Sequence, residues 1–404
     1  MTPAILNRFM VSLLISAMSL FASNAWFDDQ AVAEMELPTD KVILFWSQEQ
    51  RDYAFRNMHL VAPSRTIAAG EVRKSFNVGE QIDPEWELDG QSWNIQSYME
   101  DQHAAGVIVI HDGKIRLEEY QRDFSDEQLW TSFSVAKSLT SSLVGAAIKD
   151  GYIDSMQDPL TKYIPQLAGS GYEGVTVEHL LTMKSGVRWN EDYGDPESDV
   201  AKFSLVKPED GLDPVVVYMR TLESEAKPGR RWQYNTGETN LIGVLVANAT
   251  GKTLSEYLSE KIWQPYGMTS DAQWMLNEGG NEIAGCCISA RLRDYALFGM
   301  FALNGGVVGS ASIVPDGWFD AAGSKQAGIG VRGRGYGYQW WTYDDGPYAA
   351  QGIFGQGIFI DPERNLVIAS NGNWTEASSD EMKQRRNAFY RAVQQAVEKE
   401  LPRQ

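Results

Sequence analysis

Apolar and polar residues alternate in two stretches of this chain in the way that is typical of β-hairpins. In residues 105–121, AGVIVIHDGKIRLEEYQ, two β-rich runs flank Asp112-Gly113, and Asp-Gly between apolar runs is a strong hairpin signal. A second pair of runs, GIFIDPERNLVIAS at residues 357–370, surrounds a turn that contains proline. We therefore expect paired strands in both halves of the chain.

Elsewhere, apolar residues recur at the three- and four-residue spacing of helices. The helical segments are 131–151, 176–186 (ended by Gly186), 240–268 (divided at Gly251), 288–306 and the amphipathic 378–401. The order is strands, a long helical middle, strands and a final helix, which predicts an α/β (α+β) domain built from both chain ends. A mostly helical insertion is expected at roughly residues 150–285.

The first 25 residues have the pattern of a secretory signal peptide. Arg8 is followed by the uncharged apolar run VSLLISAMSLF, and the small residues Ser-Asn-Ala end at Ala25, before a cleavage site. The apolar run is short for a membrane span, although an uncleaved anchor is the alternative. We expect an exported protein, periplasmic or secreted, with no stable membrane span after cleavage of the signal.

The rest of the chain, about 380 residues, is long enough for one large domain or two smaller ones with a sizeable core. Residues 26–95 are mixed and polar, and we interpret them as an N-terminal extension packed on a main domain of residues 96–404. The formal net charge is −19, and no cluster of Lys and Arg offsets it. Nucleic acid and anionic lipid are therefore not expected partners.

The two cysteines, Cys286 and Cys287, are adjacent and cannot link distant segments. Their Cα atoms should lie about 3.8 Å apart, which is below the usual range for a disulfide. Two buried thiols are therefore favoured over a strained vicinal disulfide.

Ser-x-x-Lys is a weak pattern, and it occurs three times, beginning at Ser134, Ser204 and Ser224. In the second and third matches a proline follows the lysine, and proline moves the residue before it out of the helical region. Serine and lysine then need not share a face. Only the match at Ser134 lies within a predicted helix.

On that helix, Ser134 lies in the first turn and Lys137 lies one turn further along the same face. Thr131 or Ser132 can cap the start, and Gly151 follows the end. The helix N-terminus favours a developing negative charge, while apolar surroundings would lower the pKa of Lys137 and make a neutral amine available as a base. The alternative is a lysine whose stem packs on a core helix while its ammonium group reaches water.

Other hydrolase chemistries have less support in the sequence. No serine has the Gly-x-Ser-x-Gly setting of an α/β-hydrolase. The four histidines do not pair at the spacing of metal ligands, so a zinc hydrolase is not expected. No metal and no organic cofactor are implied.

Three blocks of this sequence resemble the serine β-lactamase-like family: SFSVAKSLTSSLVGAAIKDG, then YIPQL with GVTVEHLLTMKSGVRW, and later WQYNTGETNLIG. That family includes class C β-lactamases, D-alanyl-D-alanine carboxypeptidases, related esterases and 6-aminohexanoate-dimer (nylon-oligomer) hydrolases, and the similarity is greatest to the last group. The resemblance spans roughly residues 95–400. It implies a penicillin-binding-like fold, in which helices flank an antiparallel sheet.

The resemblance also implies roles for single residues. Tyr234, 100 residues after Ser134, would shuttle the proton between Ser134, Lys137 and the leaving group. The stretch GIFGQ is similar to that of the nylon-oligomer hydrolases, and by this match the backbone N–H groups of Ser134 and Ile353 would form the oxyanion hole. The alternative for Tyr234 is an aromatic anchor at a helix start.

Two departures concern the substrate. Thr236 stands where penicillin-recognising members carry asparagine, and the late strand reads QGIFGQ, from Gln351, in place of Lys-Thr-Gly or Lys-Ser-Gly. The β-lactam carboxylate then lacks its lysine partner, which favours ester or amide hydrolysis over penicillin hydrolysis. The resemblance assigns Tyr193, Thr236 and Gly352 to substrate binding, and Tyr193 would contact the scissile amide.

Tyr193 lies in the acidic stretch WNEDYGD, and Asp195 and Asp199 lie beside it. For these two aspartates a solvated acidic turn is favoured over a role in the site.

The sequence as a whole predicts an exported serine hydrolase that cleaves an amide or ester bond of a small molecule through an acyl-enzyme on Ser134. A true β-lactamase or D-alanyl-D-alanine carboxypeptidase is the first alternative. A non-catalytic cell-envelope binding module is the second, and the presence of Ser134, Lys137 and Tyr234 argues against it. The natural substrate and the oligomeric state are not indicated.

Overall fold

The computed structural model describes residues 37, 38 and 43–399 of the chain. The predicted signal peptide lies outside these residues. The described helices and strands belong to a compact unit, Pro38–Gln404. Within the described ranges, no helix combines the length and the apolar character that crossing a membrane requires.

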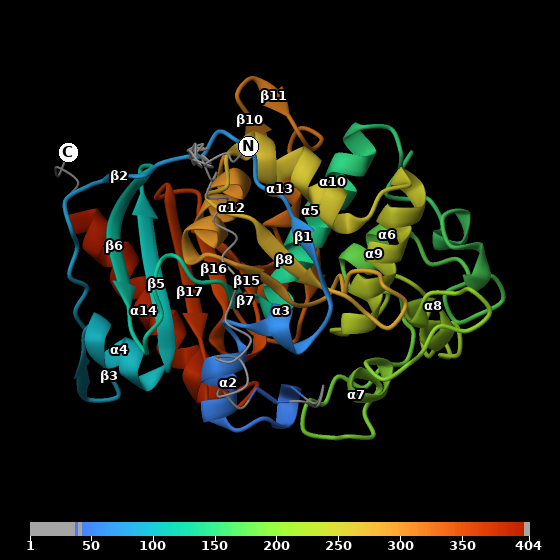
Figure 1. Ribbon diagram of the computed structural model, residues 1–404, viewed down its shortest axis with the longest axis horizontal. Coiled ribbons are helices and arrows are strands. Elements are labelled where there is room, and N and C mark those ends of the chain that lie inside the picture. The colour runs from blue at the N-terminus through green and yellow to red at the C-terminus, as the bar shows by residue number, and fades with distance from the viewer. Residues whose placement is uncertain (1–36, 39–42, 400–404) are drawn as a thin grey trace, which may run out of the picture. The chain divides into compact units, whose positions relative to one another are not determined.

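A nine-stranded sheet is the frame of this unit (Figure 1). Its strands are β2 (Asn77–Val78), β5 (Ala104–His111), β6 (Lys114–Tyr120), β12 (Ala327–Gly328), β13 (Arg334–Tyr336), β14 (Trp341–Tyr343), β15 (Tyr348–Gln351), β16 (Gly357–Asp361) and β17 (Leu366–Gly372). They lie in the order β12-β13-β14-β15-β16-β17-β5-β6-β2, and every pair is antiparallel except β2 with β6. Because β17 pairs with β5, the two halves of the chain close one sheet, as predicted.

Both predicted hairpins are confirmed. In the first, β5 and β6 meet at Asp112 and Gly113, whose φ angles of 49° and 72° are those that a tight hairpin turn needs. In the second, β16 pairs with β17 across residues 362–365. In both hairpins the turn residues give a local signal that the tertiary structure does not override.

Helices cover the two faces of the sheet and also form the part of the fold that lies beside it. They are α2 (Gln48–Ala54), α3 (Met58–Val61), α4 (Ile95–Asp101), α5 (Ala136–Lys149), α6 (Val177–Leu181), α7 (Asp199–Phe203), α8 (Pro214–Met219), α9 (Thr236–Thr250), α10 (Leu254–Leu258), α11 (Gln264–Tyr266), α12 (Leu292–Leu303), α13 (Trp318–Ala322) and α14 (Asp380–Lys399). Single turns are η1 (Ile43–Phe45), η2 (Phe133–Val135), η3 (Leu160–Lys162), η4 (Pro165–Leu167), η5 (Ser259–Trp263) and η6 (Ile353–Gly355).

Different helices pack against the two faces of the sheet. On one face, Phe389 and Val393 of α14 pack with Tyr98 of α4 against Val107 and Ile368 of the sheet. On the other face, α12 lies so close to β16 and β17 that a Cβ added at Gly299 would meet Val367 at 2.6 Å. The helices α5, α6, α8 and α9 lie beside the sheet in the helical part of the chain (Figure 1).

The described part of the N-terminal region contributes strands to three sheets. Strand β1 (Ser64–Ile67) is the edge of a four-stranded sheet with β8 (Ala272–Met275), β9 (Ile288–Ala290) and β7 (Trp130–Thr131). Two short pairs complete the fold: β3 (Trp86–Leu88) with β4 (Gln91–Trp93), and β10 (Val307–Val308) with β11 (Ala311–Ser312). Arg51 of α2 is buried and donates to Asn373 Oδ1 at 2.8 Å, so α2 lies against the end of β17.

Three expectations about the helical segments need correction. The segment 288–306 begins as strand β9, because it pairs with β7 and β8, and its helix α12 starts only at Leu292. The helix predicted at 176–186 ends at Leu181. The helical middle of the chain also contains strand β8, which pairs with the N-terminal strand β1, a long-range pairing that local periodicity does not reveal.

The expectation of two thiols is wrong, because Cys286 and Cys287 form a disulfide. The pair lies in the turn that leads into β9, where the N–H of Cys286 donates to the carbonyl of Ile283. Cys287 has a φ of 68°, a left-handed backbone conformation that is uncommon for a residue with a side chain. This turn, and not an extended segment, brings the neighbouring side chains together.

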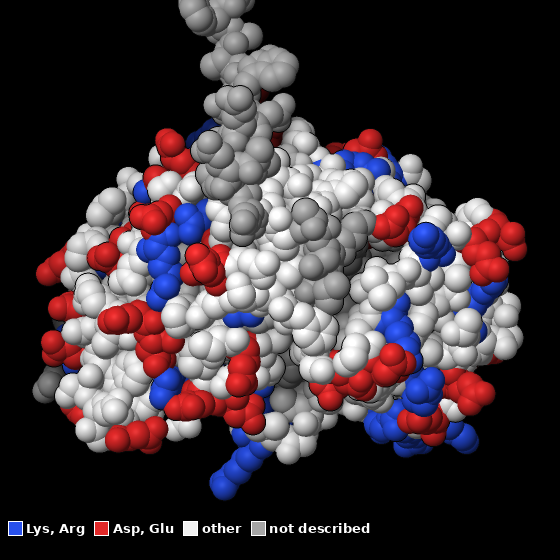
Figure 2. Space-filling view, turned by 60° about the horizontal axis from the view of Figure 1, so that its bottom comes forward, with Lys and Arg blue, Asp and Glu red and all other residues white. Residues whose placement is uncertain are grey.

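Charged side chains of both signs are mixed over the surface. On the face shown in Figure 2, Asp and Glu lie among Lys and Arg, and the described residues form no continuous basic area there.

Candidate active site

The candidate nucleophile lies on a strained turn at the start of helix α5. Ser134 is half-buried in η2, which joins strand β7 to α5. Phe133, directly before it, has a φ of 41°, and such backbone strain is common at functional sites. The expected cap is wrong, because Ser132 Oγ accepts instead from the N–H of Ile288 at 3.0 Å and ties the turn to β9.

Lys137 lies one turn after Ser134 and is almost completely buried, with 1% of its surface exposed. Its Nζ donates to the carbonyl of Gly285 at 2.8 Å and to Thr236 Oγ1 at 3.0 Å. Burial lowers the pKa of Lys137 to about 8, although the nearby Glu191 carboxylate acts in the opposite direction. A large part of the Lys137 side chains is therefore neutral at mildly alkaline pH.

Tyr234 joins the pair of Ser134 and Lys137. Its side chain is hydrogen-bonded to Ser134, and its ring centre lies 5.4 Å from Lys137 Nζ. Burial raises the pKa of Tyr234, and the Glu191 charge raises it further, so the phenol keeps its proton near neutral pH. Of these two groups, Lys137 is the one that can be unprotonated in the resting site, while Tyr234 can pass a proton on.

Glu191 is a central residue of the site that sequence reasoning missed. One carboxylate oxygen accepts from Tyr193 Oη at 2.8 Å and from the hydroxyl of Thr236. The other accepts from the backbone N–H of Thr236 at 2.9 Å and from Trp189 Nε1. With four donors around it, this half-buried carboxylate is held as a fixed negative charge beside Lys137 and Tyr234.

These contacts also place the expected substrate-binding residues Tyr193 and Thr236. Thr236 accepts from Lys137 and donates to Glu191, and Tyr193 lies near Tyr234 with a pKa that burial raises. The only sequence signal for Glu191 was its spacing in Trp189-x-Glu191-x-Tyr193, where alternate residues of one loop meet.

The two aspartates of this loop lie outside the network around Lys137. Asp199 is buried and accepts from the N–H of Asn190 and from Tyr218 Oη, both at 2.7 Å, so the expectation of a solvated turn is wrong for it. Asp195 is half-buried and accepts from the N–H of Glu197 at 2.8 Å. Both residues hold the loop that carries Glu191 and Tyr193.

Strand β15 leads into the segment expected to supply the second oxyanion donor. A Cβ added at Gly352 would meet the carbonyl oxygen of Ser132 at 2.7 Å, so only glycine lets this segment approach the nucleophile turn so closely. Ile353 follows it in η6, and Phe354 then has a φ of 59°. Strained residues thus stand next to both Ser134 and Ile353, and the rings of Phe133 and Phe354 are 5.5 Å apart.

An aromatic wall adjoins Tyr234, and we define it as Trp232, Tyr336 and Trp341. Tyr234 stacks on Trp341 with ring centres 5.4 Å apart, and it meets Tyr336 edge to face at 6.2 Å. Trp232 contacts both of the other members. Trp232 and Trp341 are half-buried, which leaves part of an apolar surface open beside the nucleophile.

A second glutamate, Glu238, lies near Glu191. Glu238, in the first turn of α9, is buried and accepts from the Ser185 hydroxyl, and its other oxygen, Oε2, has no hydrogen-bond partner. Burial raises the pKa of Glu238 to about 8, so this side chain is protonated near neutral pH. Glu238 therefore contributes no resting charge there, in contrast to Glu191.

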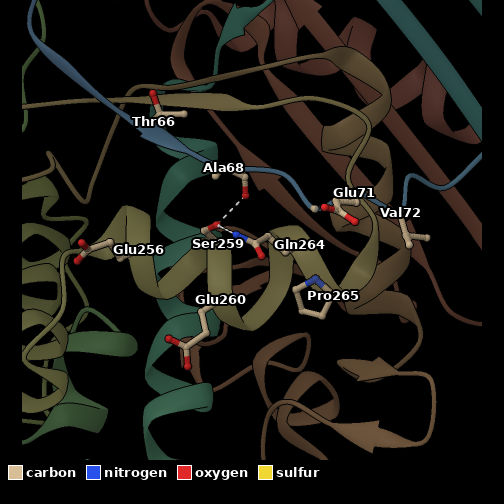
Figure 3. Close-up of a pocket in the computed structure, with 10 residues that line it drawn as sticks. Thr66, Ala68, Glu71, Val72, Glu256, Ser259, Glu260, Gln264 and Pro265 are labelled. Carbon is tan, nitrogen blue, oxygen red and sulfur yellow. Dashed lines mark hydrogen bonds between the residues drawn. The ribbon is translucent and has the colours of Figure 1, made fainter.

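A large groove of the described structure lies apart from this site. Figure 3 shows it between the end of β1 with the segment that follows and the helical segments α10, η5 and α11. Its volume is about 940 Å³. Ser259 Oγ donates to the carbonyl of Ala68 across it at 2.6 Å. None of the candidate catalytic residues lines this groove.

Comparison with known proteins gives one family. The family model described as Beta-lactamase matches residues 94–392. The 6-aminohexanoate-dimer hydrolase of Paenarthrobacter ureafaciens is 30% identical over 303 residues, which cover 70% of this chain and 76% of that protein.

Solved structures share the fold. A protein from Bacillus anthracis, named provisionally as a 6-aminohexanoate-dimer hydrolase, superposes with a TM-score of 0.76 at 21% identity, over 91% of this chain and all of the other. A penicillin binding protein from Bacillus halodurans gives a TM-score of 0.57 at 16% identity, over 73% of this chain and 98% of the other. The predicted fold class is thereby confirmed.

Proposed function

This chain belongs to the beta-lactamase family and is a beta-lactamase-fold hydrolase related to 6-aminohexanoate-dimer hydrolase, and on that premise we propose that it is an exported serine hydrolase that cleaves an amide or ester bond through an acyl-enzyme on Ser134. The observation that carries the proposal is the set of three side chains at the start of α5. Half-buried Ser134 is hydrogen-bonded to Tyr234, which keeps its proton, and buried Lys137, whose pKa is lowered to about 8, lies beside them.

In the first half of the reaction, Ser134 Oγ attacks the carbonyl carbon of the substrate. The proton of Oγ passes to Tyr234, and the phenol proton passes to neutral Lys137. The N–H groups of Ser134 and Ile353 would stabilise the oxyanion, and a donor of this kind is worth about 3 kcal/mol in the transition state. When the tetrahedral intermediate collapses, the carbon–nitrogen or carbon–oxygen bond breaks, and the leaving group takes a proton through Tyr234.

In the second half, water attacks the acyl-enzyme and gives a proton back through Tyr234 and Lys137. Ser134 then leaves with a proton on Oγ, which restores the starting state. Glu191 keeps a fixed negative charge next to Lys137 throughout, so the ammonium form that appears in each half-reaction has a nearby counter-charge.

The relation to 6-aminohexanoate-dimer hydrolase favours an amide of an amino acid as the substrate. Penicillin hydrolysis has less support, because the residues just before Ile353 are Gln351 and Gly352 and offer no lysine to a β-lactam carboxylate.

An active-site label tests the nucleophile directly. We expect a fluorophosphonate probe to modify Ser134 of the wild-type protein, as read by peptide mass spectrometry, and to leave Ser204 and Ser224 unmodified. Ser204→Ala is the matched control, because this exposed serine heads the same Ser-x-x-Lys pattern. Labelling that persists in Ser134→Ala would contradict the proposal.

Export has its own test. Expression with the native N-terminus in a bacterial host should give a protein that starts at Trp26, as measured by intact mass. A product that starts at Met1 or Thr2 would contradict the signal peptide.

A further inference from the structure

We propose that Arg334 and Arg386 form a carboxylate subsite that binds a carboxylate on the leaving-group side of the substrate. The inference rests on the proposed function, since it names the class of amide or ester that the site would accept. Arg334, Tyr343, Arg386 and Asn387 are called the guanidinium cluster below.

Arg386 of α14 is a buried cation without an acidic partner. It is 2% exposed, its Nε has no hydrogen-bond partner, and no ion pair or hydrogen bond of its guanidinium occurs among the described residues. Its guanidinium carbon lies 5.2 Å from the ring centre of Trp374. Arginine cannot lose its charge in a protein, and a buried charge without a partner is costly. The site is therefore suited to an anion.

Arg334 of β13 adds a second cation at the same place. It lies 3.9 Å from the ring centre of Tyr343, it is half-buried, and its Nε also lacks a partner. Burial lowers the pKa of Arg334, and the nearby Arg386 charge lowers it as well, so the two guanidinium groups repel each other. The side chain of Arg334 is also hydrogen-bonded to Tyr343, and it makes no ion pair with a carboxylate among the described residues. An anion between the two cations would remove this repulsion.

The guanidinium cluster lies on the same sheet face as the aromatic wall. Arg334 and Tyr336 are two residues apart on β13, so their side chains point to the same face, about 7 Å apart along the strand. Their partners on β14 are Tyr343 and Trp341, which also share that face. Because Tyr336 and Trp341 both contact Tyr234, a continuous face leads from the proton shuttle to Arg334.

The next strand and helix α14 connect the cluster to the region of the nucleophile. Tyr343 Oη donates to Asn387 Oδ1 at 3.1 Å, and it accepts from Gln351 Nε2 at 3.1 Å. Gln351 precedes Gly352, which packs against the carbonyl of Ser132. Tyr343, Gln351 and Asn387 are half-buried, so the rim of the cluster is open although Arg386 beneath it is not.

These positions select the class of ligand. Two guanidinium groups are suited to a planar carboxylate, which they can bind through paired N–H donors. Since Tyr234 would protonate the leaving group, the part of the substrate beyond the leaving nitrogen or oxygen would extend along the aromatic wall. The substrate class is therefore an amide or ester whose leaving group carries a carboxylate several bonds from the scissile bond.

The test compares two ligands that differ only in the carboxylate, N-acetyl-6-aminohexanoate and N-acetylhexylamine. Binding is measured by titration calorimetry with Ser134→Ala, which should bind without turnover. We expect the carboxylate compound to bind about 10- to 100-fold more tightly, as a charge-assisted hydrogen-bonded contact would give. In Ser134→Ala/Arg334→Gln this ratio should fall to near one, while affinity for the neutral compound is unchanged.

The matched control is Arg332→Gln, because Arg332 is exposed in the same segment and lies outside the cluster. It should keep the full ratio. Arg386→Gln should lower the ratio like Arg334→Gln, with a thermal melt that reports any loss of folding. A ratio near one in the parent Ser134→Ala, or an equal fall in Arg332→Gln, would overturn the subsite. Hydrolysis of a neutral aryl ester by the wild type is measured separately, so failure of the hydrolase proposal appears there and not in the ligand ratio.

Discussion

Two polar regions flank Tyr234, and they differ in whether their charges have partners. The proposed catalytic network, which we define as Ser134, Lys137, Glu191, Tyr234 and Thr236, is closed: Lys137 Nζ has two acceptors and the Glu191 carboxylate has four donors. The guanidinium cluster is open, because the Nε atoms of Arg334 and Arg386 have no acceptor.

The difference indicates when each region reaches its low-energy state. A network whose hydrogen bonds are already made is organised before the substrate arrives, and such preorganised dipoles can act in the transition state without rearranging. Two neighbouring guanidinium groups without a carboxylate partner are unfavourable until an anion is present. By this comparison, changes in the catalytic network should alter the rate of the chemical step, while changes in the cluster should alter the choice of substrate.

The largest effect is expected from Lys137→Arg. Arginine stays protonated and cannot accept the Ser134 proton, so kcat/KM on a reactive neutral ester should fall about 100- to 10,000-fold. Lys149→Arg, on an exposed residue of the same helix, is the control and should change the rate little. If Lys137→Arg keeps near-normal turnover together with a normal thermal melt, Lys137 is not the base, and the closed network has only a structural role.

Tyr234→Phe should come next, with a loss of about 100-fold in kcat/KM. The variant keeps the stacking on Trp341 but lacks the hydroxyl bonded to Ser134. The double variant with Lys137→Arg should lose little more than the worse single variant, because the two groups act on one proton. Tyr338→Phe, whose ring packs on Trp318, is the control. Additive losses would mean that Tyr234 and Lys137 act in separate steps.

The sequence allowed prediction of the closed network more completely than of the open cluster, for physical reasons. Ser134 and Lys137 share one helix, and Tyr234 precedes another, so local spacing and the resemblance located them. The cluster depends on strands β13 and β14, where GRGYGYQWWTYDDG mixes glycine and aromatic residues without clear alternation. Its second cation comes from α14, and only the tertiary fold brings α14 to that face.

Glu191 shows the same limit within the catalytic network. In the sequence it is one of several acidic residues in WNEDYGD, and only its alternate spacing with Trp189 and Tyr193 distinguishes it locally from Asp192. The structure distinguishes them, because Glu191 accepts from Thr236, which starts α9 in a distant part of the chain. The vicinal disulfide was mispredicted for a related reason, since the backbone turn at Cys287 could not be inferred from spacing.

Glu191→Gln should change the pH dependence more than the maximal rate. The Glu191 charge raises the pKa of Lys137, which lies at about 8, so its removal should lower that pKa. The amide can keep the geometry: its oxygen accepts from the N–H groups of Thr236 and Trp189, and its NH₂ donates to the two hydroxyls. The acidic limb of kcat/KM against pH, which requires neutral Lys137, should therefore move to lower pH, with a maximal rate within about tenfold of wild type.

Asp192→Gln is the control for this pH profile, because Asp192 is exposed in the same loop. Its acidic limb should coincide with that of the wild type. An acidic limb of Glu191→Gln that stays in place, or that moves to higher pH, would mean that Glu191 does not set the charge state of Lys137. The contrast between a region whose charges have partners and a region whose charges do not would then lose its electrostatic basis.

The smallest effect on activity is expected from Glu238→Gln, which tests why an unpartnered group is tolerated beside the closed network. Unlike arginine, Glu238 can become neutral, and its pKa of about 8 in the folded protein lies above the value of about 4.3 in an unfolded chain. Below both values the acid is protonated in both states. As pH rises from the lower to the higher value, only the unfolded chain ionises freely, so the folded protein loses stability, by up to about 1.4 kcal/mol per pH unit.

Glu238→Gln removes this titration and keeps an acceptor for the Ser185 hydroxyl. Its melting temperature should equal that of the wild type near pH 4 and exceed it by a margin that grows up to about pH 8, with kcat/KM nearly unchanged. The exposed Glu223→Gln is the matched control and should show no such divergence. If the two melting curves stay parallel from pH 4 to about pH 8, Glu238 is not a buried neutral acid. The distinction between a buried group that becomes neutral, such as Glu238, and a buried group that needs an external ion, such as Arg386, would then not hold.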